Sequence, residues 1–339
     1  METIHYQVHQ IKEAADDLLD GEVVAFPTET VYGLGADATN EEAVRKIFIA
    51  KGRPIDNPLI IHIADEKQLA EYVESIPFKA KQVIEHFWPG PCTLILKKKG
   101  PLALSVTGGL DTVGVRMPDN SVALDLIRAA KVPLAAPSAN TSGKPSPTKA
   151  EHVLKDLNGK IKAVIDGGQT GVGLESTVLD LTDPDKPTIL RPGGVSLEEL
   201  ERVIGKVYSD THLSDVNAVP KSPGMKYRHY SPEKPVWILP QSIGRIENLI
   251  SQLESEGEII GIIISEDTKL KLNRSFDNQI SLGEKSNPER AAAELYSSLR
   301  AMDEMDISLI LVESYEKNGI GTAYMNRLEK AASKNLMDY

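Results

Sequence analysis

The sequence predicts an α/β protein with two domains, a larger one built on a twisted sheet and a smaller one with a doubly wound parallel sheet. Three observations support this fold class. The 339 residues exceed what one ordinary hydrophobic core needs. Short β-rich runs separated by Gly/Pro turns fill residues 1–205. Beyond residue 235, such runs alternate with helical patterns, which is typical of a parallel sheet.

The larger domain contains eight predicted strands and a few helical patterns. The strand-like runs lie at residues 23–27, 59–63, 93–97, 113–117, 134–138, 163–167, 177–181 and 188–191. The clearest helix is predicted over residues 40–51. Asn40 can cap its N-terminus, two glutamates suit the positive end, and Gly52 followed by Pro54 stops it. Cations at residues 51 and 53 therefore lie at its C-terminal end.

A linker is predicted next, because the periodic pattern lapses and Ser, Asp, Pro and Gly dominate. We place the larger domain at residues 1–205, the linker at 206–234 and the smaller domain at 235–339. In the smaller domain, strands are predicted at 236–240, 258–265 and 307–314. Helices are predicted at 243–256, at about 288–302 and from Gly321 onward.

Composition limits the functional class. Hydrophobic residues make up 41% and charged residues 26%, as in an ordinary globular protein. No apolar run is long enough to span a membrane and the first residues do not resemble a secretory signal, so we expect a cytoplasmic protein. Cys92 is the single cysteine, which excludes a disulfide framework and a cysteine-rich zinc site and predicts a buried inert thiol.

The net charge of −11 argues against a broad electrostatic surface for nucleic acid, so any RNA contact must be weak and local. Two short basic stretches qualify: Lys97–Lys99, which is also typical of a solvated strand end, and Lys221–His229. The usual nucleotide, metal and hydrolase motifs are absent. Gly143-Lys144 is followed by proline where a P-loop needs Ser or Thr, and there is no HExxH, G-x-S-x-G or metal-spaced cluster.

Four polar loops adjoin the predicted strands, at residues 27–35, 51–59, 108–116 and 137–148. Ligand-binding residues of α/β domains gather where strands end in loops. Two of these loops suit a triphosphate: Lys51 and Arg53 supply cations, and Ser138 and Asn140 supply neutral donors.

Simpler interpretations remain open for the same residues. Lys51 and Arg53 also suit a helix C-terminus, and the small residues around Ser138 also suit ordinary turns. His62 lies in an apolar strand, where a satisfied core histidine is more usual than a ligand. Arg116 also ends an apolar strand, but a buried guanidinium needs an anionic partner.

Taken together, these segments resemble the YrdC/Sua family of threonylcarbamoyl-adenylate synthases, over essentially the whole chain and in the two-domain form. Three features carry the resemblance: PTETVYGLG at 27–35, the pairing of Lys51-x-Arg53 with Ser138-x-Asn140, and SPGMKYRHYSP at 222–232. The resemblance implies a YrdC-like α/β domain followed by a small Rossmann-like domain. It also implies a nucleotidyltransferase reaction: threonine is carboxylated by bicarbonate or CO2, the carbamate attacks the α-phosphorus of ATP, and pyrophosphate leaves.

The resemblance also implies roles for particular residues. The residues expected to hold L-threonine are Thr30, His62, Arg116, Ala136 through its backbone, and Ser176. Those expected to hold ATP are Lys51, Arg53, Asn57, Thr112, Ser138, Asn140, Ser146, Arg191 and Tyr230. Lys51, Arg53, Ser138 and Asn140 are expected to act in catalysis. Magnesium is expected to arrive with ATP and to need no site of its own on the protein.

The resemblance implies that a partner complex transfers the threonylcarbamoyl group to the tRNA adenosine beside the anticodon. No general base stands out, although His62 is a candidate by chemistry. We further expect residues 222–232 to close over the ATP site, with packing of the two domains as the alternative. Two other functions stay open: an RNA-binding module, and an enzyme that uses another carbamoyl source.

Overall fold

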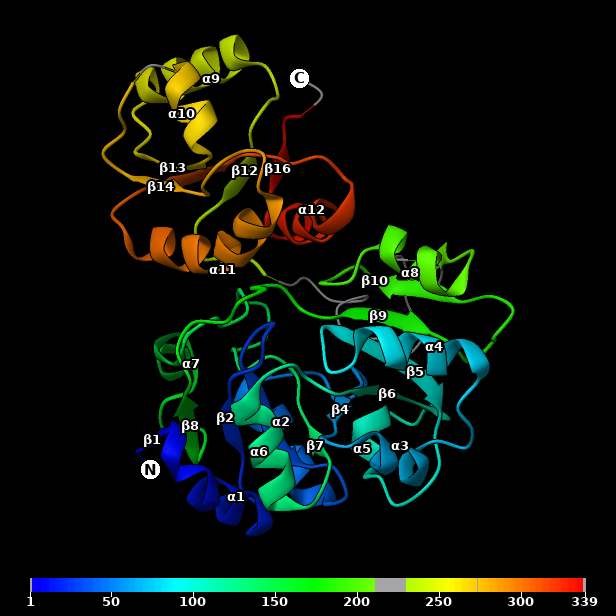
Figure 1. Cartoon of the computed structure of the whole chain (residues 1–339). Coiled ribbons are helices and arrows are strands. Elements are labelled where there is room, and N and C mark those ends of the chain that lie inside the picture. The colour runs from blue at the N-terminus through cyan, green and yellow to red at the C-terminus, as the bar shows by residue number, and fades with distance from the viewer. Residues whose placement is uncertain (1, 211–229, 273, 338–339) are drawn as a thin grey trace. The chain divides into compact units, whose positions relative to one another are not determined.

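The computed structural model describes residues 2–210, 230–272 and 274–337 (Figure 1). The part of the predicted linker and lid at residues 211–229 lies outside these ranges. The described chain forms two compact units. The first contains most residues up to 210, and the second contains those from Tyr230 on together with the short loops Gly143–Pro145 and Val172–Leu174.

The first unit is built on an eleven-stranded mixed sheet, so the predicted α/β class is confirmed (Figure 1). The strand order is β1-β8-β2-β3-β7-β4-β6-β5-β9-β10-β11. The strands are β1 (Ile4–Gln7), β2 (Val24–Phe26), β3 (Gly33–Asp37), β4 (Ile60–His62), β5 (Cys92–Lys97), β6 (Thr112–Arg116), β7 (Leu134–Ala135), β8 (Ala163–Asp166), β9 (Thr177–Asp180), β10 (Thr188–Arg191) and β11 (Tyr208–Ser209). All eight predicted strands are present, and β1, β3 and β11 are additional.

The helices of this unit cover the sheet unequally. They are η1 (Val8–Gln10), α1 (Ile11–Leu19), α2 (Glu41–Lys51), α3 (Glu66–Tyr72), α4 (Phe78–Phe87), α5 (Leu104–Thr107), α6 (Ser121–Ala130), α7 (Ala150–Leu157) and α8 (Leu197–Ile204). The larger core packs α2, α3, α4, α7 and α8 against one face. The opposite face is covered by α1 and α6 over β1, β8, β2 and β7 only. Among the described residues, no helix contributes to the apolar cluster on that face over β4, β5, β9 and β10.

Helix α2 forms as its sequence predicts. The Asn40 side chain accepts hydrogen bonds from the backbone N–H groups of Glu42 and Ala43. Gly52 ends the helix in the left-handed conformation, with φ of 62°. This stop places Lys51 in the last turn, with its side chain buried.

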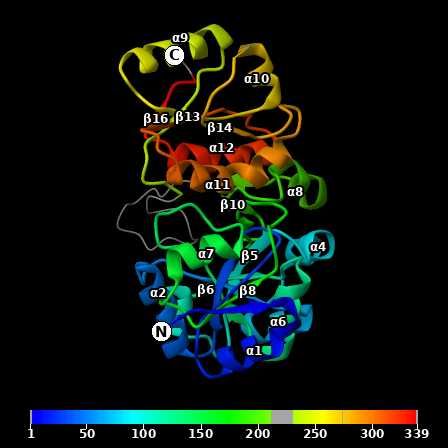
Figure 2. The same ribbon diagram turned by 90° about the vertical axis from the view of Figure 1, so that its left-hand side faces the viewer.

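The second unit is a doubly wound parallel sheet, as predicted, with strand order β14-β13-β15-β12-β16. Its strands are β12 (Val236–Ile238), β13 (Ile260–Ile264), β14 (Gln279–Ser281), β15 (Leu309–Val312) and β16 (Lys334–Asn335). Its helices are α9 (Ile243–Ser255), α10 (Glu266–Leu272), α11 (Pro288–Glu304) and α12 (Gly319–Ala331). Figure 2 shows α9 and α10 on one face of this sheet and α11 and α12 on the other.

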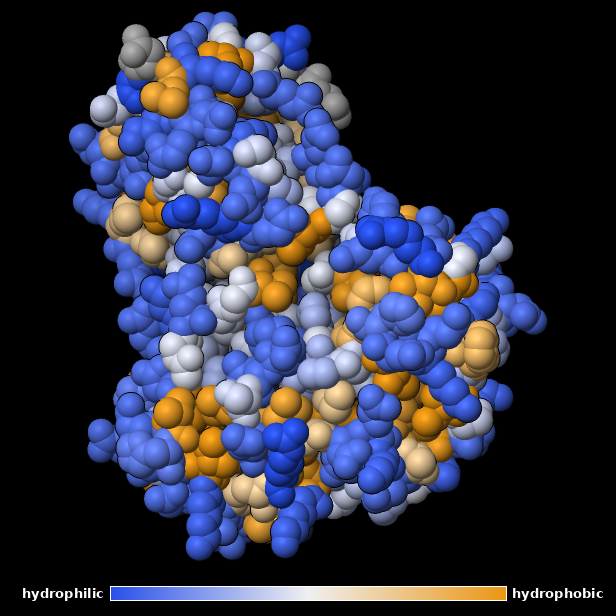
Figure 3. All heavy atoms as spheres, in the orientation of Figure 1, coloured by the Kyte–Doolittle hydropathy of each residue, from blue (hydrophilic) through white to orange (hydrophobic). Residues whose placement is uncertain are grey.

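The surface in Figure 3 is mostly hydrophilic, with separate apolar areas. Large apolar side chains that are more than 70% exposed include Ile49, Phe78, Leu104 and Leu270. Within the described ranges, no helix has the length and apolarity that a membrane span requires. Cys92 is buried, as predicted, and burial raises the pKa of its thiol to about 12, so the thiol stays protonated.

Candidate functional site

The helix-free part of the first sheet carries two kinds of side chain. In the parallel pair β4 and β6, His62 lies opposite Arg116 and Ile60 lies opposite Gly114. The antiparallel partner β5 places Ile95 opposite Gly114. Alternate residues of a strand face the same side of a sheet. His62 and Arg116 therefore face the same side as Ile60 and Ile95, which form an apolar floor next to them.

Arg116 is the centre of the polar part. Its side chain is 5% exposed, and its Nη2 lies 2.6 Å from Oε2 of Glu29, which is itself 12% exposed. Its Nη1 donates to the Thr30 hydroxyl at 3.0 Å, and its Nε donates to the carbonyl of Gly90 at 3.2 Å. The predicted anionic partner of this buried guanidinium is therefore present and comes from the PTETVYGLG loop.

The carboxylate of Glu29 is held mainly by its ion pair with Arg116. Neither of its carboxylate oxygens makes a hydrogen bond of ordinary geometry within the described residues, although one lies in the ion pair with Arg116. Buried carboxylates are normally satisfied by several donors, so this one is poised to exchange partners.

His62 is buried beside this pair. Burial, with a smaller contribution from the positive charge of Arg116, lowers the pKa of His62 to about 3, so the ring is neutral at pH 7. Its Nδ1 has no hydrogen-bond partner in the described part of the chain, and its ring meets Phe26 edge to face at 6.1 Å. His62 is therefore not the satisfied core histidine of the simpler interpretation.

Ser176 and Arg191 form a second polar group on the neighbouring strands. The Ser176 hydroxyl lies 2.8 Å from that of Thr93. Arg191, which is 5% exposed, donates to the Ser176 carbonyl at 2.9 Å and to its hydroxyl at 3.1 Å. The structure thus joins a residue expected to hold threonine to one expected to hold ATP. Ala136 is also buried, and its backbone N–H already donates to the Ile60 carbonyl at 2.9 Å.

The two loops predicted to bind triphosphate meet directly. Lys51 is 2% exposed and its ammonium donates to the carbonyl oxygens of Ser138 and Asn140. The Ser138 hydroxyl in turn donates to Oδ1 of Asn140 at 2.5 Å. Lys51 therefore does more than complement a helix end, because it fixes the shape of the 137–148 loop. Arg53 donates to the carbonyl of Pro58, a residue of its own loop, at 3.0 Å.

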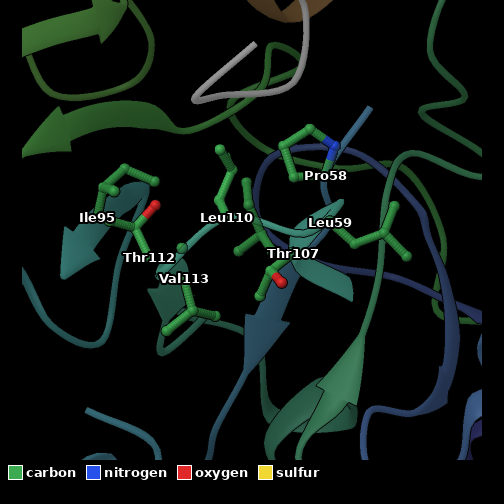
Figure 4. Close-up of a pocket in the computed structure, with 9 residues that line it drawn as sticks. Pro58, Leu59, Ile95, Thr107, Leu110, Thr112 and Val113 are labelled. Carbon is green, nitrogen blue, oxygen red and sulfur yellow. The ribbon is translucent and has the colours of Figure 1, made fainter. Parts of the chain in front are cut away.

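The remaining residues expected to bind ATP surround the apolar floor or lie near its loops. Asn57 is 1% exposed, and its Oδ1 lacks a hydrogen-bond partner within the described residues. Ser146 donates to Oε1 of Glu175 at 2.5 Å. Figure 4 shows Thr112 with Leu110 and Ile95 around a small pocket, which is lined by residues of β4, β5 and β6 and of the adjoining loops. A Cβ on Gly114 would lie 3.1 Å from the side chain of Ile95, so a larger residue at this position would crowd the apolar floor.

Tyr230 belongs to the second unit. Its ring stacks on that of Tyr296 at 5.4 Å, and the guanidinium of Arg327 lies 5.5 Å from its centre. It adopts φ of 67°, which is uncommon for a residue other than glycine. No group of three or more metal-ligating side chains occurs in the described ranges.

Comparison with known proteins identifies the family of this chain. The Sua5/YciO/YrdC family model, described as telomere recombination, matches residues 16–193, and a model described as threonylcarbamoyl-AMP synthase, C-terminal domain, matches 195–333. A threonylcarbamoyl-AMP synthase of Bacillus subtilis is 53% identical over 95% of this chain and 93% of its own. The chain therefore belongs to the Sua5/YciO/YrdC family.

A second relative, the threonylcarbamoyl-AMP synthase of Pyrococcus abyssi, is 48% identical over 97% of this chain and 95% of its own. The crystal structure of P. abyssi Sua5 complexed with L-threonine superposes with a TM-score of 0.91 at 45% identity, covering 99% of this chain and 100% of that one. The predicted family, with its YrdC-like domain and its second domain, is therefore confirmed.

One residue of the site was not expected from the family resemblance. Glu29 lies between Thr28 and Thr30 in the PTETVYGLG loop and forms the ion pair with Arg116. A carboxylate within that polar loop, together with the need of buried Arg116 for an anion, is the signal from which Glu29 could have been predicted. The distance of 87 positions between the two residues hid the pairing.

Proposed function

We propose that this family member makes L-threonylcarbamoyl-AMP and pyrophosphate from L-threonine, bicarbonate or CO2, and ATP. The observation that carries the proposal is the buried Arg116, which faces Thr30 and a carboxylate held by little except charge. Such a guanidinium suits the carboxylate of an amino acid, because its fork of donors matches two oxygens. The names of the relatives and the L-threonine complex of P. abyssi Sua5 support the choice of amino acid.

In this proposal, the threonine carboxylate replaces Glu29 on Arg116. Thr30, Ser176, neutral His62 and the backbone of Ala136 complete the pocket for the rest of the amino acid. The displaced Glu29 then accepts a proton from the threonine ammonium. The free amine adds to CO2, so that the C–N bond forms as one C–O π bond opens, and the nitrogen then releases its second proton to water, which leaves the carbamate. Glu29 thus supplies the proton acceptor that the sequence alone did not reveal.

ATP occupies the neighbouring loops and floor. Lys51, Arg53, Ser138 and Asn140 stabilise the charge of the phosphates, and Asn57, Thr112, Ser146, Arg191 and Tyr230 complete the nucleotide site. A carbamate oxygen attacks the α-phosphorus, the bond to the β-phosphate oxygen breaks, and pyrophosphate leaves with the magnesium that ATP brought. Positioning and charge neutralisation supply most of the catalysis of this second step.

The product is an activated adenylate. We propose that a tRNA threonylcarbamoyltransferase complex consumes it to modify the adenosine next to the anticodon. We also propose the division into a catalytic domain at 1–205, a linker at 206–234 and a second domain at 235–339, with residues 222–232 acting as the lid.

The decisive experiment measures pyrophosphate release from ATP and magnesium with bicarbonate and single amino acids. Release is expected only when bicarbonate and L-threonine are both present, because a carbamate is the nucleophile. L-serine should be less efficient by about 1–3 kcal/mol, since it lacks the methyl group of threonine. Release in bicarbonate-free buffer, or equal use of serine and threonine, would contradict the proposal.

The alternative of an RNA-binding module makes a different prediction. Several phosphate contacts would give a steep fall of RNA affinity with salt. The net charge of −11 opposes this, so a shallow slope is expected in a salt titration with a tRNA anticodon stem-loop. The other alternative, an enzyme with a different carbamoyl source, predicts turnover without bicarbonate when that source is supplied.

A further inference from the structure

Two short loops from the earlier part of the chain belong to the second unit. They are Gly143–Pro145 and Val172–Leu174. The first loop leads directly into Ser146, which is expected to bind ATP. The second leads into Glu175, the neighbour of Ser176, which is expected to bind threonine. The residues that hold these two loops therefore bear on the geometry of the proposed reaction.

Arg300 of α11 holds the end of the first loop. Its side chain is buried, its Nη2 donates to the Pro145 carbonyl at 2.5 Å, and its Nε donates to the same oxygen at 3.1 Å. At the start of the loop, the Ser231 N–H donates to the Gly143 carbonyl at 2.9 Å. The Pro145 carbonyl and the Ser146 nitrogen belong to one planar peptide group. Two donors of a buried guanidinium therefore fix the plane of the peptide from which Ser146 begins.

The second loop packs against the same helix. Gly173 has φ of 73°, and a Cβ at this position would lie 2.4 Å from Cα of Ala293 and 2.5 Å from its carbonyl oxygen. Only glycine permits so close an approach in this conformation. Ala293 and Arg300 are about two helical turns apart, so they lie on the same side of α11. One side of α11 therefore holds both loops.

A hydrogen bond joins the two residues that follow these loops. The Ser146 hydroxyl donates to Oε1 of Glu175 at 2.5 Å, and both side chains are buried. A hydrogen bond of this length tolerates little movement of either partner, and a buried partner that loses it is costly. A displacement of Ser146 therefore also disturbs Glu175, the residue next to Ser176.

We propose that Arg300 is a positioning residue for the synthesis of threonylcarbamoyl-AMP, an inference that rests on the proposed function. Arg300 holds the Pro145 peptide, and this peptide sets the position of the Ser146 hydroxyl at the ATP site. The bond from Ser146 to Glu175 then fixes the two loops relative to each other. The second domain thus takes part in ATP binding through its helix α11.

Steady-state pyrophosphate release by Arg300→Met is the first test, because methionine keeps an apolar stem and removes every donor. KM for ATP should rise about tenfold, the effect of losing charge-assisted hydrogen bonds, and KM for threonine should stay within about twofold. Partial unfolding would instead lower kcat and leave KM for ATP unchanged. Arg300→Lys keeps the charge and should recover part of the ATP affinity. Arg290→Met, at an exposed arginine of the same helix, should match the parent. An unchanged KM for ATP in Arg300→Met would overturn the proposal.

Two further measurements test whether Arg300 acts through Ser146. In a Ser146→Ala background, Arg300→Met should raise KM for ATP by less than about twofold, because the two changes remove one interaction chain. Additive effects would overturn the proposal.

The ¹⁵N spectrum of the full chain needs no turnover. The amide signals of Ser146 and Glu175 should shift in Arg300→Met and stay in place in Arg290→Met. An unshifted Glu175 signal would overturn the proposal even in an active enzyme. Shifted signals in a protein whose parent releases no pyrophosphate would overturn the proposed function and leave the contact of Arg300 with the Ser146 peptide standing.

Discussion

Each unit of this protein buries a glutamate beside a cation, but the two pairs differ in what else holds them. Glu313 in the second unit accepts two hydrogen bonds besides its ion pair with Lys285. Glu29 in the first unit has Arg116 at 2.6 Å, and its oxygens lack other hydrogen-bond partners among the described residues. A fully bonded carboxylate holds loops together, whereas one held by charge alone can exchange its partner for a substrate.

The comparison teaches that burial of a charge does not by itself mark a site. Both pairs involve glutamate side chains that are at most 12% exposed. Their hydrogen bonds distinguish them, and so does their setting: the partner of Glu29, Arg116, lies opposite neutral His62 in the sheet. The four predictions below test whether the first pair acts in chemistry and the second in stability.

Glu29→Gln should give the largest effect. The glutamine keeps the shape of the side chain but cannot accept the ammonium proton, so kcat should fall by about 10²–10⁴. KM for threonine should stay the same or fall, because nothing then competes for Arg116. Steady-state pyrophosphate release measures both constants. Glu22→Gln, which alters an exposed pair with Lys46, is the matched control. A rise in KM with unchanged kcat would assign Glu29 to binding alone.

Arg116→Ala should lower kcat/KM for threonine by about ten- to 150-fold, the loss expected for a charge-assisted hydrogen bond of 1.5–3 kcal/mol. ATP affinity, measured by calorimetry, should change little. Arg116→Lys keeps the charge without the planar fork of donors, so its kcat/KM for threonine should lie between those of the parent and of Arg116→Ala. Loss of ATP affinity with threonine affinity intact would mean that the two halves of the site are reversed.

His62 predicts a pH dependence of stability. The unfolded chain binds a proton at this residue near pH 6.5, but the buried ring does so only at about pH 3, so lowering the pH favours the unfolded state. When the pH is lowered from 6.5 to 5, the free energy of unfolding should fall by about 2 kcal/mol.

This pH-dependent fall in the free energy of unfolding should disappear in His62→Asn. It should persist in His86→Asn, because His86 is exposed. Urea unfolding followed by Trp88 fluorescence in a Trp237→Phe background reports on the first unit. Equal pH dependence of the His62 variant and the parent would exclude a buried neutral histidine.

Glu313→Gln should leave turnover within about twofold of the parent and lower the stability of the second unit by about 2 kcal/mol, because Lys285 loses its counter-ion. Trp237 fluorescence in a Trp88→Phe background follows this unit. Glu254→Gln, in the exposed pair with Arg274, is the control and should cost less than about 1 kcal/mol. A large loss of turnover with intact stability would remove the distinction between the two pairs.

The sequence by itself determined the class of fold, most strands of both units and helix α2. Local signals suffice for these, because period, caps and stop residues act within one turn or strand. The contact of Lys51 with the 137–148 loop also agrees with the pairing of the Lys51-x-Arg53 and Ser138-x-Asn140 motifs in the sequence. Short elements with little periodicity were missed, notably β3 with its two glycines, α10 and β14.

Tertiary structure alone decided what the site residues touch. Strand order places Thr30 and Glu29 against Arg116, and His62 opposite it, although these contacts join segments far apart in the chain. The contact of α11 with the Pro145 carbonyl depends on the tertiary fold in the same way, because Arg300 lies 155 positions further along the chain. Local propensity cannot encode these meetings, because they arise from the order and register in which strands bury their apolar faces.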